Sequence, residues 1–172
     1  MERLRASIRS IPDFPRPGIL FRDITTLLKE GVLFRQAVDL FADRYSSQHV
    51  DAVVGIESRG FLFGSALAYQ LGCGVVPIRK KGKLPAATFS EKYDLEYGED
   101  SIEIHRDALE PKSRVVLIDD LLATGGTMRA AVNLLKNFQD VHILEVAFLI
   151  ELVELDGRSQ LPDVNVYSAL LY

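Results

Sequence analysis

The fold of this chain is decided by Val115-Val-Leu-Ile-Asp-Asp-Leu-Leu-Ala-Thr-Gly-Gly-Thr127. Its first four residues are apolar without alternation, as in a strand buried on both faces. Asp119 and Asp120 then stand where we expect that strand to end. After the turn, apolar residues recur at helical spacing: Met128, Ala131, Val132, Leu135 and Phe138. The stretch predicts a strand, a tight turn and a helix of a largely parallel α/β sheet.

The turn at residues 123–127 has the composition of an anion site. Two glycines and two threonines bring free backbone amides to the start of a helix, where the helix dipole also favours negative charge. Acids beside a phosphate need partners, which ribose hydroxyls and a divalent cation supply. The stretch therefore indicates a site for a sugar phosphate. The alternative is an ordinary helix-capping turn beside two solvated aspartates.

Bulk composition excludes several classes of protein. The chain has 172 residues, 48% of them hydrophobic, and a net charge of −4, so we expect one globular domain over residues 1–172 and neither nucleic acid nor membrane as a partner. Cys73 is the only cysteine, which excludes an intramolecular disulfide and suits a reducing cytoplasm. His49, His105 and His142 lack the spacing of a zinc site. The N-terminus has no apolar signal core, and we expect a cytoplasmic protein.

The remaining sequence alternates between strand and helix patterns. Apolar spacing predicts a short opening helix through Leu4, Ile8 and Ile11, and the proline-rich residues 12–18 predict an irregular segment. Residues 84–106 predict a two-stranded flap with a mobile tip. The other predicted elements are helices over 32–45 and from residue 60 to Leu71, and strands over 52–56, 75–79 and 143–150. Such alternation predicts helices on both faces of the sheet.

Two further polar segments follow predicted strands. Glu57-Ser58-Arg59-Gly60 stands between a strand and a helix, and Arg59 is suited to grip an anion bidentately. A basic cluster follows the next strand: Arg79, Lys80, Lys81 and Lys83. Because ligands bind at the carboxyl ends of parallel strands, we expect both segments beside Asp119. The alternatives are a helix cap and a solvated basic turn.

The segment around Asp119 resembles the diphosphate-sugar motif of the type I phosphoribosyltransferases, and other strings resemble the adenine-using branch of that family. Together these strings reach from near the N-terminus to within twenty residues of the C-terminus. They are Ile11-Pro-Asp-Phe-Pro-Arg-Pro-Gly-Ile-Leu-Phe-Arg-Asp-Ile-Thr25, Gly55-Ile-Glu-Ser-Arg-Gly-Phe-Leu-Phe-Gly64, Arg79-Lys-Lys-Gly-Lys-Leu-Pro85, Leu95-Glu-Tyr-Gly98 and Leu152-Val-Glu-Leu155.

The resemblance implies transfer of a phosphoribosyl group from phosphoribosyl diphosphate (PRPP) to adenine, giving AMP and pyrophosphate. It implies Mg²⁺ held mainly by PRPP, near Asp119 and Asp120, and a homodimer with Arg79 near the partner's site. It also implies a hood over residues 1–30 that recognises the base and a flap over 84–106. The implied 5′-phosphate residues are Ala123, Thr124, Gly125, Gly126 and Thr127. The implied pyrophosphate residues are Glu57, Ser58, Arg59, Arg79 and Lys83. The implied adenine residues are Leu20, Phe21, Arg22 and Leu155. The implied catalytic residues are Glu96, Asp119, Asp120 and Arg59, with Tyr97 beside Glu96 on the flap.

One departure from the family pattern is visible. Many members have Asp where this chain has Glu57, which keeps the charge and lengthens its reach. The resemblance also implies a cis peptide bond between Glu57 and Ser58. Two alternatives stay open: a non-catalytic regulator that binds PRPP or a nucleotide, and a phosphoribosyltransferase for another base.

Overall fold

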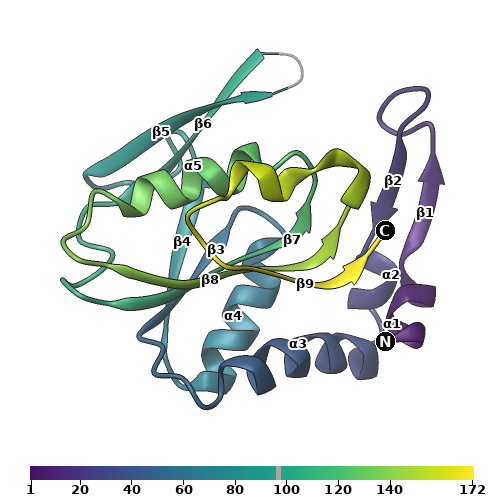
Figure 1. Ribbon diagram of the computed structural model, residues 1–172, viewed down its shortest axis with the longest axis horizontal. Coiled ribbons are helices and arrows are strands. Elements are labelled where there is room, and N and C mark those ends of the chain that lie inside the picture. The colour runs from purple at the N-terminus through teal and green to yellow at the C-terminus, as the bar shows by residue number, and fades with distance from the viewer. Residues whose placement is uncertain (96–97) are drawn as a thin grey trace. The chain divides into compact units, whose positions relative to one another are not determined.

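The computed structural model describes residues 1–95 and 98–172 (Figure 1). The chain divides into two compact units, Met1–Phe41 (the N-terminal unit) and Ala42–Tyr172 (the main unit). Glu96 and Tyr97, predicted to act at the flap tip, lie outside the described residues.

The N-terminal unit contains a two-stranded antiparallel ribbon and short helices. Its elements are α1 (Glu2–Ser7), β1 (Arg9–Pro12), β2 (Leu20–Asp23), α2 (Thr25–Leu28) and most of α3 (Gly31–Tyr45). The predicted opening helix is therefore wrong beyond Ser7, because Ile8 is already extended and residues 9–12 form a strand. Pairing with β2 is the physical reason, because residues 9–12 form an antiparallel ladder with residues 20–23, and Pro12 in addition disfavours helical backbone at Ile11. Residues 13–19 form an irregular connection, as predicted.

The main unit is built on a seven-stranded sheet of order β5-β6-β4-β3-β7-β8-β9. The strands are β3 (Ala52–Ile56), β4 (Gly74–Lys80), β5 (Thr88–Leu95), β6 (Gly98–His105), β7 (Arg114–Leu122), β8 (His142–Glu151) and β9 (Val166–Leu171). The pairs β4–β3, β3–β7, β7–β8 and β8–β9 are parallel, and β5–β6 and β6–β4 are antiparallel. The predicted parallel sheet and the two-stranded flap, β5 with β6, are confirmed. The edge strand β9 is an addition to the predicted list.

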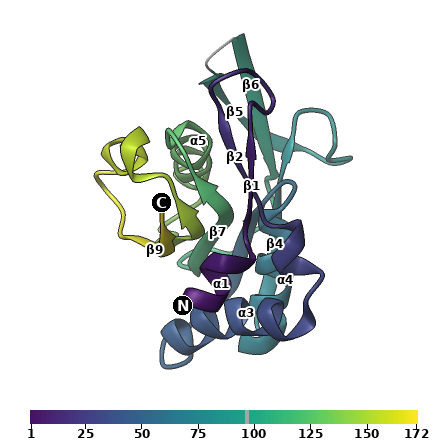
Figure 2. The ribbon, with the colours of Figure 1, turned by 90° about the vertical axis from the view of Figure 1, so that its right-hand side faces the viewer.

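Helices cover both faces of this sheet, α5 (Gly126–Leu135) on one and α4 (Gly60–Leu71) on the other (Figures 1 and 2). Alternate residues of β3 explain the two layers. Val54 and Ile56 join the apolar core that α5 closes, whereas Gly55 faces α4, close to Phe61. Two short 3₁₀ helices, η1 (Val153–Leu155) and η2 (Gly157–Gln160), follow β8.

Strand β7 is longer than predicted, since it continues to Leu122. Asp119 and Asp120 therefore belong to the strand, where Asp119 pairs with Phe148 of β8. The ladder between β7 and β3 stops at Ile118, opposite Gly55. The acids thus lie on a projecting strand end that is paired on one side only.

Candidate functional site

Three polar segments meet at one edge of the sheet, as predicted. β4, β3 and β7 are parallel neighbours, so their carboxyl ends are adjacent. These ends carry Arg79, the Glu57–Arg59 segment and Asp119. We describe in turn the loop after β7, the acids, and the cluster around Glu57.

The loop at residues 123–127 encloses a small cavity at the start of α5. The cavity measures about 80 Å³, and its lining includes residues 121–128, Asp119 and Phe148. Gly125 is the N-cap of α5 with φ 86°, a conformation that favours glycine. The first turn of α5 contains no acidic residue, so its amides and dipole face the loop without an internal counter-charge.

Gly157 of η2 packs closely against the backbone of this loop. A Cβ added at Gly125 would lie 2.4 Å from the Gly157 carbonyl oxygen, and one added at Gly157 would lie 2.3 Å from the Ala123 carbonyl oxygen. Both approaches are too close for any side chain. The backbone conformation of residues 123–126 therefore depends on a segment about thirty residues further along the chain. The sequence analysis did not identify Gly157 as part of the site.

Asp119 and Asp120 are adjacent acids beside the loop. The Asp120 amide donates to Asp119 Oδ1 at 2.8 Å, and Arg59 Nε lies 3.0 Å from Asp120 Oδ2. Burial, and then repulsion from Asp120, raise the pKa of Asp119. Burial also raises the pKa of Asp120, while the Arg59 charge opposes that rise. A cation arriving at this pair would favour its fully ionised form.

Gly60 permits the close approach of α4 to the acids. A Cβ at this position would lie 2.9 Å from Asp119 Oδ1 and 2.8 Å from the Ile118 carbonyl oxygen. The first residue of α4 is thus packed directly on the end of β7, and Arg59 before it is held at Asp120.

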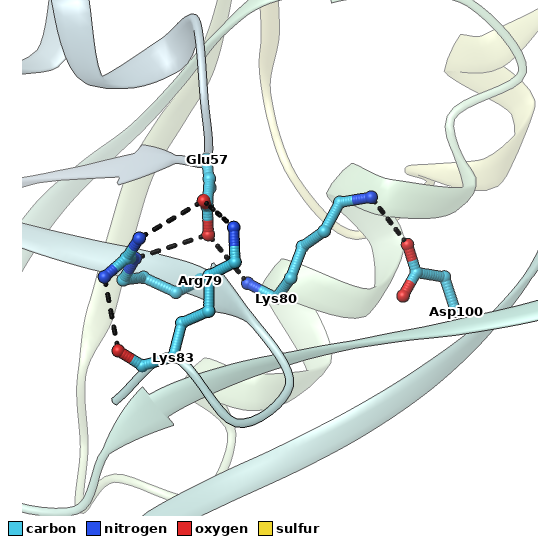
Figure 3. Close-up of polar contacts among 5 residues, drawn as sticks. All are labelled: Glu57, Arg79, Lys80, Lys83 and Asp100. Carbon is cyan, nitrogen blue, oxygen red and sulfur yellow. Dashed lines mark hydrogen bonds and ion pairs between the residues drawn. The ribbon is translucent and has the colours of Figure 1, made fainter. Parts of the chain in front are cut away.

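Glu57 is the centre of a cationic cluster (Figure 3). Arg79 donates to both of its oxygens at 3.2 and 3.3 Å, and Lys83 Nζ donates at 2.8 Å. The Lys80 amide donates at 3.0 Å. Burial by itself would raise the pKa of Glu57, but the bonds from Lys83, Arg79 and the Lys80 amide lower it to about 2. The sequence predicted these residues at one site but not this pairing, in which the acid neutralises the two expected anion ligands.

The peptide bond between Glu57 and Ser58 is cis, as the family resemblance implied. Ser58 is exposed.

The residues present fit a magnesium ion only in part. Within the described ranges, no group of three or more His, Cys, Asp or Glu side chains is placed to bind a metal. Asp119 and Asp120 offer hard oxygen donors, but Asp120 is engaged with Arg59. A magnesium ion here would need most of its ligands from a substrate and water.

The residues predicted to bind a base belong to two segments. Leu20 is exposed and Phe21 is half-buried on β2, where the Phe21 ring meets Phe14 edge-to-face at 5.1 Å. Arg22 donates to Ser10 Oγ at 2.5 Å. The ribbon consists of β1 and β2, so its ladder does not use the backbone groups on the outer edge of β2. Leu155, the last residue of η1, is 44% exposed in the main unit.

Among residues 1–95 and 98–172, no helix combines the length and the apolar character that a membrane span requires.

Comparison with known proteins gives consistent results. The model of the phosphoribosyl transferase domain matches residues 23–167. An adenine phosphoribosyltransferase from Trichlorobacter lovleyi is 55% identical over 172 residues, which is 100% of both chains.

Solved structures agree along the whole chain. The crystal structure of adenine phosphoribosyltransferase from Thermoanaerobacter pseudethanolicus has a TM-score of 0.95 at 46% identity and covers 99% of each chain. The enzyme from Saccharomyces cerevisiae, crystallised with adenine and an imino-altritol bisphosphate, has a TM-score of 0.92 at 39% identity. That match covers 98% of this chain and 97% of the yeast chain.

Proposed function

The chain belongs to the adenine phosphoribosyltransferase family, and we propose that it transfers the phosphoribosyl group of PRPP to adenine, with AMP and pyrophosphate as products. One observation carries this proposal: a backbone-lined cavity and a cluster of cationic side chains lie at one sheet edge, beside the half-buried Asp119 and the buried Asp120. PRPP has a phosphate at one end of its ribose and a pyrophosphate at the other. Two anion seats that flank an acid pair suit that shape.

The 5′-phosphate belongs in the cavity formed by Ala123, Thr124, Gly125, Gly126 and Thr127. The amides at the start of α5 and the two threonine hydroxyls are hydrogen-bond donors for the phosphate. The first turn of α5 contains no carboxylate that would compete with the phosphate for these donors. Because Gly157 packs against Gly125, the donors are preorganised and little ordering is needed when phosphate binds.

The pyrophosphate belongs at Glu57, Ser58, Arg59, Arg79 and Lys83. Arg79 and Lys83 provide the positive charge, and Glu57 holds both of them ready in the absence of substrate. Pyrophosphate brings more negative charge than one carboxylate, so it outcompetes Glu57 for these donors. As pyrophosphate leaves, Glu57 takes them back.

Asp119 and Asp120 lie between the two seats. As the bond from C1′ to pyrophosphate weakens, positive charge grows on the ribose, and preorganised carboxylates stabilise it electrostatically. Arg59 keeps Asp120 oriented in a site that otherwise raises its pKa. We propose that Mg²⁺ is bound mainly by PRPP, near these acids; when bound, it neutralises charge on the departing pyrophosphate.

Adenine belongs at Leu20, Phe21, Arg22 and Leu155. Phe21 offers an aromatic face for stacking, and the outer edge of β2 offers backbone donors and acceptors for the edge of the base. Glu96 at the flap tip is proposed as general acid or base, with Tyr97 beside it. We further propose a single phosphoribosyltransferase domain, a homodimer with Arg79 near the partner's site, and a cytoplasmic location.

A comparison of acceptor bases tests the function. Purified protein, PRPP and Mg²⁺ are combined with adenine, hypoxanthine, guanine, xanthine or orotate, and nucleotide formation is measured. We expect efficient turnover with adenine alone. Turnover of another base would favour a phosphoribosyltransferase for that base. PRPP binding without AMP formation would favour a non-catalytic regulator.

A further inference from the structure

Glu151, the last residue of β8, is a buried carboxylate at the same sheet edge as the site. Only 4% of it is exposed, and a buried charge requires a partner. Arg158 of η2 supplies that partner through two parallel bonds: its Nε donates to Oε1 and its Nη2 to Oε2, both at 2.7 Å. These bonds lower the pKa of Glu151 against the effect of burial. The pair therefore fixes Arg158 relative to the end of β8.

Arg158 also binds the neighbouring strand. Its Nη1 donates to the carbonyl oxygen of Val166, the first residue of β9, at 3.0 Å. The three donor nitrogens belong to one rigid guanidinium plane, so they set the orientation of Arg158 as well as its distance from the sheet. Arg158 thus attaches η2 to two strands at once.

The residue before Arg158 is Gly157, which packs against the loop at residues 123–127. The Gly157 carbonyl oxygen lies against Gly125, and the Ala123 carbonyl oxygen lies against Gly157. A Cβ added at Gly157 would also lie 2.8 Å from Leu122 Cδ1. Packing this close transmits a displacement instead of absorbing it. Since Gly157 and Arg158 are consecutive residues of η2, the position of Arg158 determines where Gly157 stands against the loop.

A second bond joins η2 to α5, from Arg129 Nη1 to Gln160 Oε1 at 2.7 Å. This bond is exposed to solvent, so water replaces it at little cost. The bonds from Arg158 are different, because breaking them leaves the buried Glu151 carboxylate without its partner. Arg158 is therefore the stronger anchor of η2.

We propose that Arg158 is a positioning residue for the 5′-phosphate seat. Paired with Glu151, it holds the Gly157 carbonyl against Gly125 and so keeps the amides of residues 123–127 in the geometry that binds phosphate. The inference rests on the proposed function, because it requires phosphate at this loop. Arg158 touches no substrate atom in this scheme.

Glu145 forms the same kind of pair near the start of β8, at the opposite end of the strand. Arg44 donates to both of its oxygens, and the side chains of Arg44 and Arg158 are exposed to nearly the same extent, 42% and 45%. The strand between Glu145 and Glu151 is about 20 Å long. The Arg44 pair therefore stabilises the fold far from the loop at residues 123–127, and it provides a matched control.

Arg158→Met tests the positioning role, since methionine keeps an unbranched side chain but donates no hydrogen bond. Binding of ribose 5-phosphate and of pyrophosphate is measured by titration calorimetry. We expect Arg158→Met to bind ribose 5-phosphate about 10- to 100-fold more weakly than the wild-type chain, because the phosphate donors are displaced. Pyrophosphate binding should stay within about twofold, because the cluster at Glu57 is built on β3 and β4, on the far side of β7 from β8. Arg44→Met should leave both affinities within about twofold.

A double variant separates loss of stability from loss of positioning. Arg158→Met and Arg44→Met each leave a buried glutamate without its partner, so both should lower the melting temperature. Glu151→Met combined with Arg158→Met removes the stranded charge, and apolar replacement of a whole buried ion pair often restores stability. We expect this double variant to melt close to the wild-type temperature and still to bind ribose 5-phosphate weakly.

The measurements also distinguish the positioning role from the phosphate seat itself. Recovery of ribose 5-phosphate binding in the double variant, or equal losses of that binding in Arg158→Met and Arg44→Met, would overturn the positioning role and leave the seat standing. Equal weakening of pyrophosphate and ribose 5-phosphate in Arg158→Met would do the same. If the wild-type chain does not bind ribose 5-phosphate, the seat and the positioning role are both overturned.

Discussion

The two proposed anion seats at the sheet edge are built from different materials. The loop at residues 123–127 uses backbone amides, and its shape is fixed by the contact between Gly125 and Gly157. The cluster at Glu57 uses long cationic side chains, and an internal carboxylate holds them. The loop is rigid, and the first turn of α5 contains no acidic side chain. The cluster contains its own counter-ion, the Glu57 carboxylate, which a bound anion can replace.

This difference matches the fate of the two groups in the proposed reaction. The 5′-phosphate stays attached to the ribose from PRPP to AMP, so a preorganised seat can hold it throughout. Pyrophosphate must bind and then leave, so a seat with an internal competitor favours its release. The predictions below test this contrast, from the largest expected effect to the smallest.

Gly125→Ala should have the largest effect, because it distorts the rigid loop at residues 123–127. The φ of 86° is unfavourable for alanine by about 1–2 kcal/mol, and the new Cβ would collide with the Gly157 carbonyl. We expect kcat/KM for PRPP to fall about 1,000-fold as the phosphate donors move. Gly72→Ala is the matched control: its φ is 68° with open space around it, so it should lose stability and keep activity.

Asp120→Asn should come next, because it removes a charge between the two seats without changing shape. We expect kcat to fall about 100-fold, the usual scale for one preorganised electrostatic group. Asp51→Asn is the control, since Asp51 precedes β3 at the opposite end of that strand, where it accepts from the Arg114 amide at 2.7 Å. Equal kcat in the wild-type chain and Asp120→Asn would remove Asp120 from the mechanism.

Glu57→Gln should have a smaller effect, of opposite sign for binding. Removing the internal competitor leaves Arg79 and Lys83 with an excess of positive charge, so we expect pyrophosphate to bind about threefold to tenfold more tightly. Product release should slow accordingly, and titration calorimetry with product-inhibition kinetics measures both. Glu103→Gln is the control, because Glu103 accepts from Gly82 in the same basic loop at 3.0 Å. Weaker pyrophosphate binding in Glu57→Gln would show that Glu57 only orients the cations.

The smallest effect concerns pH. The pKa of Glu57 is about 2 in the folded chain and 4.5 ordinarily, so its ionised form stabilises the fold at pH above 4.5. That contribution is lost as the pH falls from 4.5 towards 2, because the unfolded chain takes up the proton first. Denaturation at a series of pH values should show the wild-type chain losing more stability over this range than Glu57→Gln. Parallel curves would indicate that the ion pairs contribute little.

Sequence patterns predicted the sheet and the place of the site for local reasons. Apolar runs at 52–56 and 115–118 are strands because both of their faces are buried. The polar residues after them share an edge because the strands are parallel. Two predictions failed because strand pairing overrides local patterns. Residues 9–12 pair with β2 instead of continuing the opening helix, and β7 continues along β8 to Leu122, past the acids at which we expected it to end.

The chemistry of each segment is determined by the sequence itself. A glycine-rich turn before a helix exposes amides, adjacent aspartates repel each other, and a run of basic residues attracts anions wherever the fold places them. Only the tertiary structure decided which of these groups meet. Glu57 with Lys83 and Gly125 with Gly157 are each about thirty residues apart. Such pairs depend on the order of the strands and on the packing of α5 and η2, which no local pattern records.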